Sequence, residues 1–591
     1  MKACILIICL FYTCFSYSQD NLLLAENYFR QGEYEKASHI YKSLFEKNTF
    51  NADYLKKLVT CYQETRQFQL AETLLRTLLK EHVTRKYLHV ELGYNYERQQ
   101  QIELANVEYK KALDYISTNP YSAGIIGRTF QQNNALDRAI LAYTKAMQLN
   151  PNSNYQFQIA QIFGEKGAFE KMFEAYINLV DSNERYIRSV QRLISRYISD
   201  DPLDKNNIAL KKSLLRKSIS NPKNIWNELL SWLFSKQKEY NKAFVQEKAL
   251  FKRDVMYLDN ISRLGKIAFE NKDYSTAKEC FSFTLENTSF IDERVNSELF
   301  LLKVAIAKED KNILQLFDVA LETYGINANT IVIQMEYANF LTFKKGQPKK
   351  SEAILERALQ YSRSKFQRAQ IKLKLGEIFV FTSQFNKALI YFSQVQTSLK
   401  NHPLSQEARF KVAQTSYFKG DFPWAMAQLK VLKGSTTQLT ANDAVDLFLI
   451  ISDNQPKDSI PSGLKQYAKA DLLSYQNKYI QALTILEHIC QKFKGFPVED
   501  EAFFKQAKIM IYLKRYEDAV TAFKKVIDLD PEGILNDDAI FEIAELYRNK
   551  LNLPEKAKEY YQKIIFDYPS SFYLVDARRK YRELRGDTVQ Q

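Results

Sequence analysis

A spacing of 34 residues between matching small and aromatic positions is the feature that most constrains the fold of this chain. Four alanines follow one another at that step: Ala37, Ala71, Ala105 and Ala139. Nine positions before each alanine stands an aromatic residue: Tyr28, Tyr62, Tyr96 and Phe130. Large residues follow four positions after: Tyr41, Leu75, Tyr109 and Tyr143. Residues twelve positions before are smaller: Ala25, Val59, Gly93 and Gly127. Such columns predict a repeated structural unit.

Each unit is predicted to be a hairpin of two antiparallel helices. The small residues let the two helices approach closely, the aromatic residues fill the space beside the crossing, and a turn such as residues 30–33 reverses the chain. One hairpin cannot bury both of its faces, so stacking of hairpins stabilises each of them. The chain holds only 16 Gly and 13 Pro in 591 residues. That is too few turn residues for a β protein of this length, and it predicts an all-α chain.

The order of small, aromatic, alanine and aromatic positions over 34 residues resembles the tetratricopeptide repeat (TPR) family. Residues 120–153 match the family pattern best, and Pro151 stands where the second helix should close. They depart from it in having no Trp near the start of the unit. The resemblance implies an all-α, right-handed α-solenoid of about twelve TPR-like hairpins.

Breaks in the repeat predict how the chain is divided. We expect a signal peptide at residues 1–18, regular N-terminal units at 19–183, and divergent and regular units at 184–433. An irregular joint is expected at 434–463, followed by C-terminal units with a capping helix at 464–591. Within the joint a helix is predicted only at 441–452. The C-terminal units repeat at 37 to 38 residues, as Ala482, Ala519 and Ala557 mark. They are similar to TPR units of exported bacterial envelope proteins, such as the outer-membrane assembly lipoproteins.

The first residues have the pattern of a secretory signal peptide. Lys2 precedes a largely apolar run, and the small residues Ser16 and Ser18 stand before a cleavage point. The alternatives are a buried N-terminal helix and a lipoprotein acylated at Cys14, whose flank lacks the Leu and the small residue typical of such sites. Removal of residues 1–18 lowers the formal net charge from +14 to +13, because they hold one Lys and no acid. This pattern predicts a protein of the periplasm or the outer membrane.

No motif in the sequence indicates catalysis, a cofactor or a metal site. The chain has five His, and it lacks HExxH, paired Cys motifs, phosphate-binding glycine loops and GxSxG. We therefore predict that it is not an enzyme, with no cofactor and no metal. The basic residues are spread along the chain rather than gathered on one surface, which argues against nucleic acid as a partner. Peripheral association with an anionic membrane stays open.

The resemblance implies that the first helix of each hairpin lines a concave groove that binds a peptide or a helix. Counting from the small packing residue, the groove candidates are Lys56, Tyr94, Arg98 and Arg128, with Val90 and Gln63 among their neighbours. The clamp by which chaperone-binding TPR modules hold a C-terminal carboxylate is absent. Only two of its five positions are basic as required, and neither Asn is present.

These observations predict a non-catalytic scaffold or adaptor that binds envelope proteins or their peptide segments, in outer-membrane assembly or secretion. Two alternatives stay open. A self-assembling structural scaffold would form homo-oligomers through its C-terminal helices. A binder of anionic glycan or lipid would use the excess of Lys and Arg, and added salt would weaken its binding.

Overall fold

The computed structural model describes residues 21–432, 438–455, 463–530 and 533–586. Within these residues all regular secondary structure is helical and no strand is present, so the predicted all-α solenoid of hairpins is confirmed. The predicted signal peptide, including Cys14, lies outside the described residues. None of the helices in the described ranges combines the length and the apolar character needed to cross a membrane.

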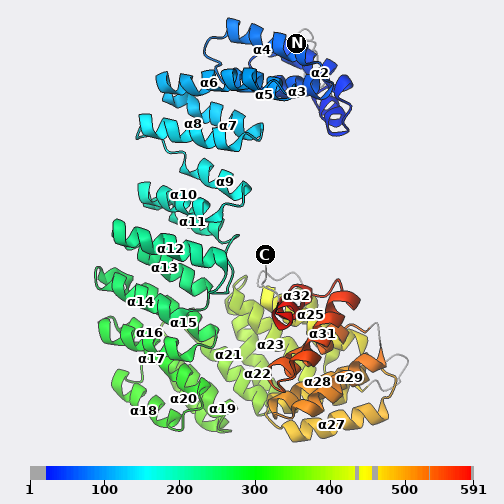
Figure 1. Cartoon of the computed structure of the whole chain (residues 1–591). Helices are drawn as coiled ribbons and strands as arrows, with labels where there is room; N and C mark the ends of the chain where they lie inside the picture. The colour runs from blue at the N-terminus through cyan, green and yellow to red at the C-terminus, as the bar shows by residue number, and fades with distance from the viewer. Residues whose placement is uncertain (1–20, 433–437, 456–462, 531–532, 587–591) are drawn as a thin grey trace, which may run out of the picture. The chain divides into compact units, whose positions relative to one another are not determined.

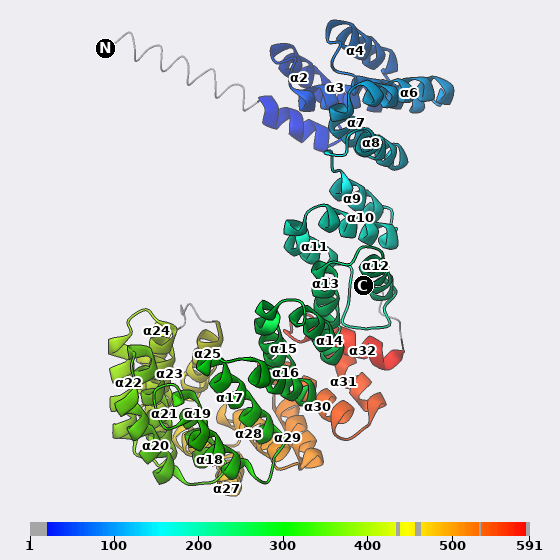
Figure 2. The ribbon, with the colours of Figure 1, turned by 90° about the vertical axis from the view of Figure 1, so that its left-hand side faces the viewer.

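The chain divides into two units, residues 1–246 and 247–591. In the first unit successive hairpins stack on one another, as Figures 1 and 2 show. A helix at residues 21–30 comes first. The labelled helices that follow are α2 (Tyr34–Lys47), α3 (Ala52–Glu64), α4 (Phe68–Glu81), α5 (Leu88–Glu97), α6 (Ile102–Thr118), η1 (Pro120–Ser122), α7 (Ala123–Gln132), α8 (Leu136–Leu149), α9 (Gln156–Glu165), α10 (Phe169–Ser182), η2 (Glu184–Tyr186), α11 (Ile187–Ile194), α12 (Lys205–Ser220) and α13 (Asn224–Lys236).

The second unit is built in the same way, after α14 (Tyr240–Phe251), which crosses the division. Its helices are η3 (Val255–Tyr257), α15 (Leu258–Glu270), α16 (Tyr274–Asn287), α17 (Ile291–Ala307), α18 (Ile313–Tyr324), α19 (Ile331–Phe343), α20 (Pro348–Tyr361), α21 (Lys365–Phe381), α22 (Phe385–Ser398), α23 (Pro403–Lys419), α24 (Phe422–Leu432), α25 (Gln438–Asp453), α26 (Leu464–Tyr475), α27 (Tyr479–Lys492), α28 (Val498–Tyr512), α29 (Tyr516–Leu529), α30 (Asn536–Asn549), α31 (Pro554–Asp567) and α32 (Leu574–Arg585).

The predicted packing of small against aromatic residues is present in both units. The four marker alanines of the first unit are at most 1% exposed. A Cβ atom added to Gly127 would lie 2.5 Å from Cε1 of Tyr143, and one added to Gly376 would lie 2.3 Å from Cε1 of Phe392. In these two hairpins the aromatic ring of the second helix therefore fills the space that a Cβ atom would need.

The turns inside the first four hairpins each use a residue in the left-handed region. Gly32, Arg66, Gln100 and Asn134 have φ of 79°, 58°, 62° and 57°. The next amide then donates back to the carbonyl of the aromatic column, as Gln101 N does to Tyr96 O at 3.0 Å. This is the arrangement in which glycine is favoured after a helix, because a Cβ is strained there. Three of the four turns thus carry a strained residue.

Gln100→Gly is expected to stabilise the first unit by about 1 kcal/mol, because it removes that strain from an exposed turn position. Urea denaturation followed by circular dichroism measures the change. Lys110→Gly, at an exposed position inside α6, is the control and should destabilise by about 0.5–1 kcal/mol. A loss of stability in Gln100→Gly would show that the turn is not strained.

The helix predicted at 441–452 is confirmed as part of α25. Ala444 and Ile451 are fully buried in a core cluster that also holds Leu429 from α24 and Tyr467 from α26. The remaining parts of the predicted joint, residues 434–437 and 456–462, lie outside the described residues. The joint at 434–463 stays a prediction, and the division of the chain into two compact units falls after Gln246.

Candidate functional site

The first helices of neighbouring hairpins are joined by ion pairs whose partners lie about one repeat apart. The separation of 33 to 35 residues matches the repeat, so equivalent faces of successive hairpins carry opposite charges. The pairs are Arg98–Glu64 (3.0 Å), Lys56–Glu91 (2.9 Å), Lys303–Glu336 (3.8 Å), Lys411–Glu377 (3.1 Å), Lys508–Glu542 (2.8 Å) and Arg548–Glu583 (2.8 Å). Many charges on this face are therefore engaged with one another rather than presented to a ligand.

Lys56 holds three successive hairpins together. From α3 its Nζ lies 3.0 and 2.9 Å from the two carboxylate oxygens of Glu91 on α5, and it also donates to Oδ1 of Asn133, the residue that ends α7. Asn133 Nδ2 donates to Glu91 Oε2 at 3.2 Å. The Glu91 side chain is only 7% exposed. Lys56 thus neutralises a buried carboxylate, and its first role is structural.

Lys56→Met is expected to destabilise the first unit by about 1–2 kcal/mol, because Glu91 stays buried with only the hydrogen bond from Asn133. The midpoint of urea denaturation measures this effect. The double variant Lys56→Met with Glu91→Leu removes both charges and should recover most of the loss. If the single variant is as stable as the original chain, Glu91 does not depend on Lys56.

The structure places Tyr94 beside both Lys56 and Arg98, whereas no contact within the described ranges joins Arg128 to these three residues. Lys56 Nζ lies 5.7 Å from the centre of the Tyr94 ring. The pKa of the Arg98 guanidinium is raised, first by its hydrogen bond to Glu64 and then by one to Tyr94. Arg128 is exposed on α7, and within the described ranges its side chain makes no hydrogen bond or ion pair. Of the four candidates it is the cation most available to a ligand.

Two neighbours expected in the groove are buried instead. Val90 is 0% exposed and Gln63 is 2% exposed, so the expectation that they line a groove is wrong. Gln63 Nε2 faces Oδ1 of buried Asn95 at 3.5 Å, and Asn95 Nδ2 donates to Phe68 O at 3.1 Å. The hydrogen bonds of these polar side chains are made between helices. A sequence pattern cannot distinguish such buried polar residues from polar residues that face solvent.

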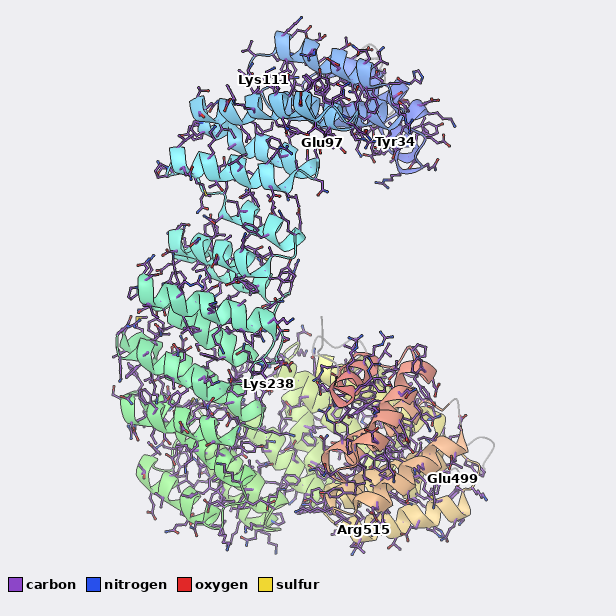
Figure 3. The ribbon with its side chains drawn as sticks, viewed as in Figure 1. Tyr34, Glu97, Lys111, Lys238, Glu499 and Arg515 are labelled. Carbon is purple, nitrogen blue, oxygen red and sulfur yellow. The ribbon has the colours of Figure 1, made fainter. Side chains whose placement is uncertain are left out.

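The polar groups beside them act in helix packing. Glu97, labelled in Figure 3, accepts a hydrogen bond from the Tyr109 hydroxyl at 2.6 Å. His89 Nδ1 lies 2.6 Å from Glu108, which Lys111 also contacts at 2.7 Å. Burial raises the pKa of Glu108, but the hydrogen bonds from His89 and Lys111 outweigh burial and lower it. Across the described ranges no group of three or more His, Cys, Asp or Glu is placed to hold a metal ion.

A pocket in the second unit was missed by the sequence reasoning. It has a volume of about 690 Å³ and lies between α25, α26, α28 and the segment that leads into α30. Six of its lining side chains are carboxylates and two are lysines. Glu499, labelled in Figure 3, marks the beginning of α28, where the adjacent acids Asp500 and Glu501 enter the pocket. The acidic first turn of α28 was the available sequence signal, but only the fold places it opposite other acids.

Two segments match the family model described as tetratricopeptide repeat, residues 501–533 and 538–571. They coincide with the hairpins α28–α29 and α30–α31, so these two hairpins of the second unit are similar to tetratricopeptide repeats. No curated protein matches the chain. Among solved structures, yeast Tom70 is 16% identical with a TM-score of 0.29, covering 80% of this chain and 99% of its own. The structure of Naa15/Naa10 bound to HypK-THB is 13% identical with a TM-score of 0.27, covering 96% of each chain.

Proposed function

We propose that this chain is a non-catalytic scaffold that binds segments of other proteins along the first-helix faces of its hairpins. The observation that carries the proposal is the pair of tetratricopeptide repeats at 501–571, set in a chain whose other hairpins use the same packing. Stacked helix pairs present extended surfaces on which a peptide or helix can lie. The repeated ion pairs fix the spacing of these faces, and the unpaired side chains between them give the surface its selectivity.

In the first unit the proposed contact surface is formed by Tyr94, Arg98 and Arg128. Arg128 offers a guanidinium that is free to take a carboxylate of the partner in a bidentate arrangement. Tyr94 offers an aromatic ring on the preceding first helix α5, while Lys56 holds the underlying helices in place. This division of roles makes Arg128 the binding anchor.

The partner is proposed to be an envelope protein, engaged in outer-membrane assembly or secretion. Support comes from the signal-like N-terminal residues and from the similarity of the C-terminal units to those of exported envelope proteins. Cleavage after Ser18 would leave the mature chain in the periplasm or at the outer membrane. The expected basic charge of that chain would also favour peripheral contact with anionic lipid.

In-cell crosslinking of a C-terminally tagged chain, followed by mass spectrometry, tests the proposal. Dominant capture of one envelope protein is expected, with crosslinks on the first-helix faces. Arg128→Ala should reduce that capture, whereas Lys110→Ala, an exposed cation on the second helix α6, should not. Capture that is equal for both variants would remove Arg128 from the binding surface. Capture of no protein partner would contradict the scaffold function.

One observation favours self-assembly as the second candidate. The last hairpin exposes large apolar side chains, with Phe566, Phe572 and Val575 exposed by 70%, 92% and 76%. Exposed apolar groups of this size are typical of surfaces that associate with another chain. Sedimentation tests this function: the apparent molecular mass of the original chain should rise with concentration, whereas the Phe572→Ser variant should stay a monomer.

A further inference from the structure

The pocket in the second unit combines an apolar wall with an acidic rim. Tyr467 of α26 and Phe504 of α28 line it, and the tyrosine is only 4% exposed. Its volume of about 690 Å³ is that of a site for a small ligand or for one or two side chains. The carboxylates of Asp446 and Asp453 on α25 face those of α28 across the opening.

The two lysines of the pocket form their ion pairs with acids outside its lining. Lys505 forms an ion pair with Asp471, and Lys508 forms one of 2.8 Å with Glu542. Neither of these two acids is among the lining residues. With six carboxylates against two lysines, both already paired with other acids, the lining keeps an excess of negative charge.

The local electrostatics show that these acids repel one another. Burial, followed by the charges of Asp500, Asp471 and Asp453, raises the pKa of Glu501 to about 8, against the lowering effect of Lys505. The pKa of Asp500 is also raised, mainly by burial. On the facing helices the pKa values of Asp446 and Asp538 are raised by burial as well, although the Tyr573 hydroxyl donates to Asp538 at 2.6 Å. A cation placed among these groups would relieve both effects.

A buried amide in the wall points to a hydrogen-bond donor as the missing partner. Asn454 lines the pocket and is only 2% exposed. Its Nδ2 donates to Ile450 O at 3.0 Å, but its Oδ1 has no hydrogen-bond partner. Buried amide oxygens are nearly always paired, so an unpaired one at a pocket wall indicates a position for an N–H group of a ligand. This observation is independent of the carboxylates.

We propose that this pocket binds a lysine or arginine side chain, flanked by apolar residues, from a segment of a partner protein. The inference rests on the proposed scaffold function and names the chemistry of one partner segment. The ammonium or guanidinium group lies among the carboxylates of Asp500, Glu501 and Asp453. One of its N–H groups reaches Asn454 Oδ1, and the alkyl part of the side chain lies against Tyr467 and Phe504.

Purified protein and two synthetic peptides test the site. One fluorescein-labelled peptide alternates Arg and Leu, and the other carries citrulline in place of Arg, so it keeps the shape but lacks the charge. We expect the Arg peptide to bind at least about tenfold more tightly in fluorescence anisotropy, as a cation partly desolvated among carboxylates should. The preference should increase as pH rises from about 7 to about 9, where Glu501 loses its proton.

Two double variants with the same charge change separate the pocket from general acidity. Asp500→Asn with Glu501→Gln alters the first turn of α28 inside the pocket, and should abolish the preference for Arg over citrulline. Glu517→Gln with Asp518→Asn alters the exposed first turn of α29 and should keep it. Circular dichroism melting confirms that each variant is folded.

Three outcomes would overturn the proposal. The first is equal binding of the two peptides, and the second is an Arg preference that survives in the pocket variant. The third is a dimer that the Arg peptide dissociates, because a second copy of the chain would then be the occupant of the pocket. Because the assay uses purified components, its failure leaves in-cell capture of a partner unaffected. Loss of in-cell capture with intact peptide binding would instead contradict the scaffold function alone.

Discussion

Gly376→Ala is expected to lower the free energy of unfolding of the second unit by about 2–3 kcal/mol, a large effect for one methyl group. The new Cβ would lie 2.3 Å from Cε1 and 2.5 Å from Cζ of Phe392. Phe392 is fully buried, so its ring cannot move away without displacing the hairpin α21–α22. Guanidinium denaturation followed by circular dichroism measures the change.

The same substitution in another first helix provides the control. A Cβ on Gly124 of α7 would meet only Tyr155, at the ordinary contact distance of 3.5 Å. Gly124→Ala should therefore stabilise the first unit by about 0.5–1 kcal/mol, as expected for glycine in a helix. Adding Phe392→Leu to Gly376→Ala should restore part of the loss. A neutral effect of Gly376→Ala would mean that the helices of this hairpin can separate without cost.

Glu501→Gln is expected to stabilise the second unit at alkaline pH by on the order of 3 kcal/mol. In the folded protein burial and then neighbouring acids raise the pKa of Glu501 from 4.5 to about 8. Between these two pH values the folded state holds a proton that the unfolded state has lost. The free energy of unfolding therefore decreases as pH rises from about 4.5 to about 8, and the neutral Gln removes this decrease.

Thermal melting at about pH 5 and about pH 9 measures the effect, because the window lies between the unfolded and folded pKa values. The variant should resemble the original chain at the lower pH and melt at a higher temperature at the upper one. Glu517→Gln, on an exposed turn of α29, should change neither value. An unchanged pH dependence in Glu501→Gln would show that this carboxyl ionises normally. A residue that destabilises its own fold is typical of a binding site.

The hairpin fold was predictable because its determinants repeat. Columns such as those of Ala105 and Tyr109 recur at one spacing, and the residues of one column have the same packing role in successive hairpins. Even the helix in the irregular region after residue 433 was predicted, as the stretch between one segment rich in Ser and Thr and another rich in Pro and Ser. The clash that requires Gly127 is local to one helix crossing, so sequence spacing locates it correctly.

The candidate site was less predictable, because binding residues differ from structural ones by their partners rather than by their type. Lys56 and Arg128 both hold positions predicted to line the groove, yet one neutralises buried Glu91 and the other faces solvent. Val90 holds a position that suits a groove, but in the structure it is fully buried between helices. The acidic pocket joins residues from α25 to α30 that no single repeat contains, so no column could indicate it.

The contacts of Lys56 also affect how the first unit opens. In a linear array of repeats each hairpin feels only its immediate neighbours, and the array can fray one hairpin at a time from its end. The ammonium group of Lys56 contacts residues of both the next hairpin and the one after it. Peeling away the hairpin α3–α4 would uncover the Glu91 charge in the layer beneath and free Asn133 in the layer after that. Opening of this end is therefore expected to involve three hairpins together, which makes the N-terminal array more cooperative under pulling or proteolysis than its repeat count suggests.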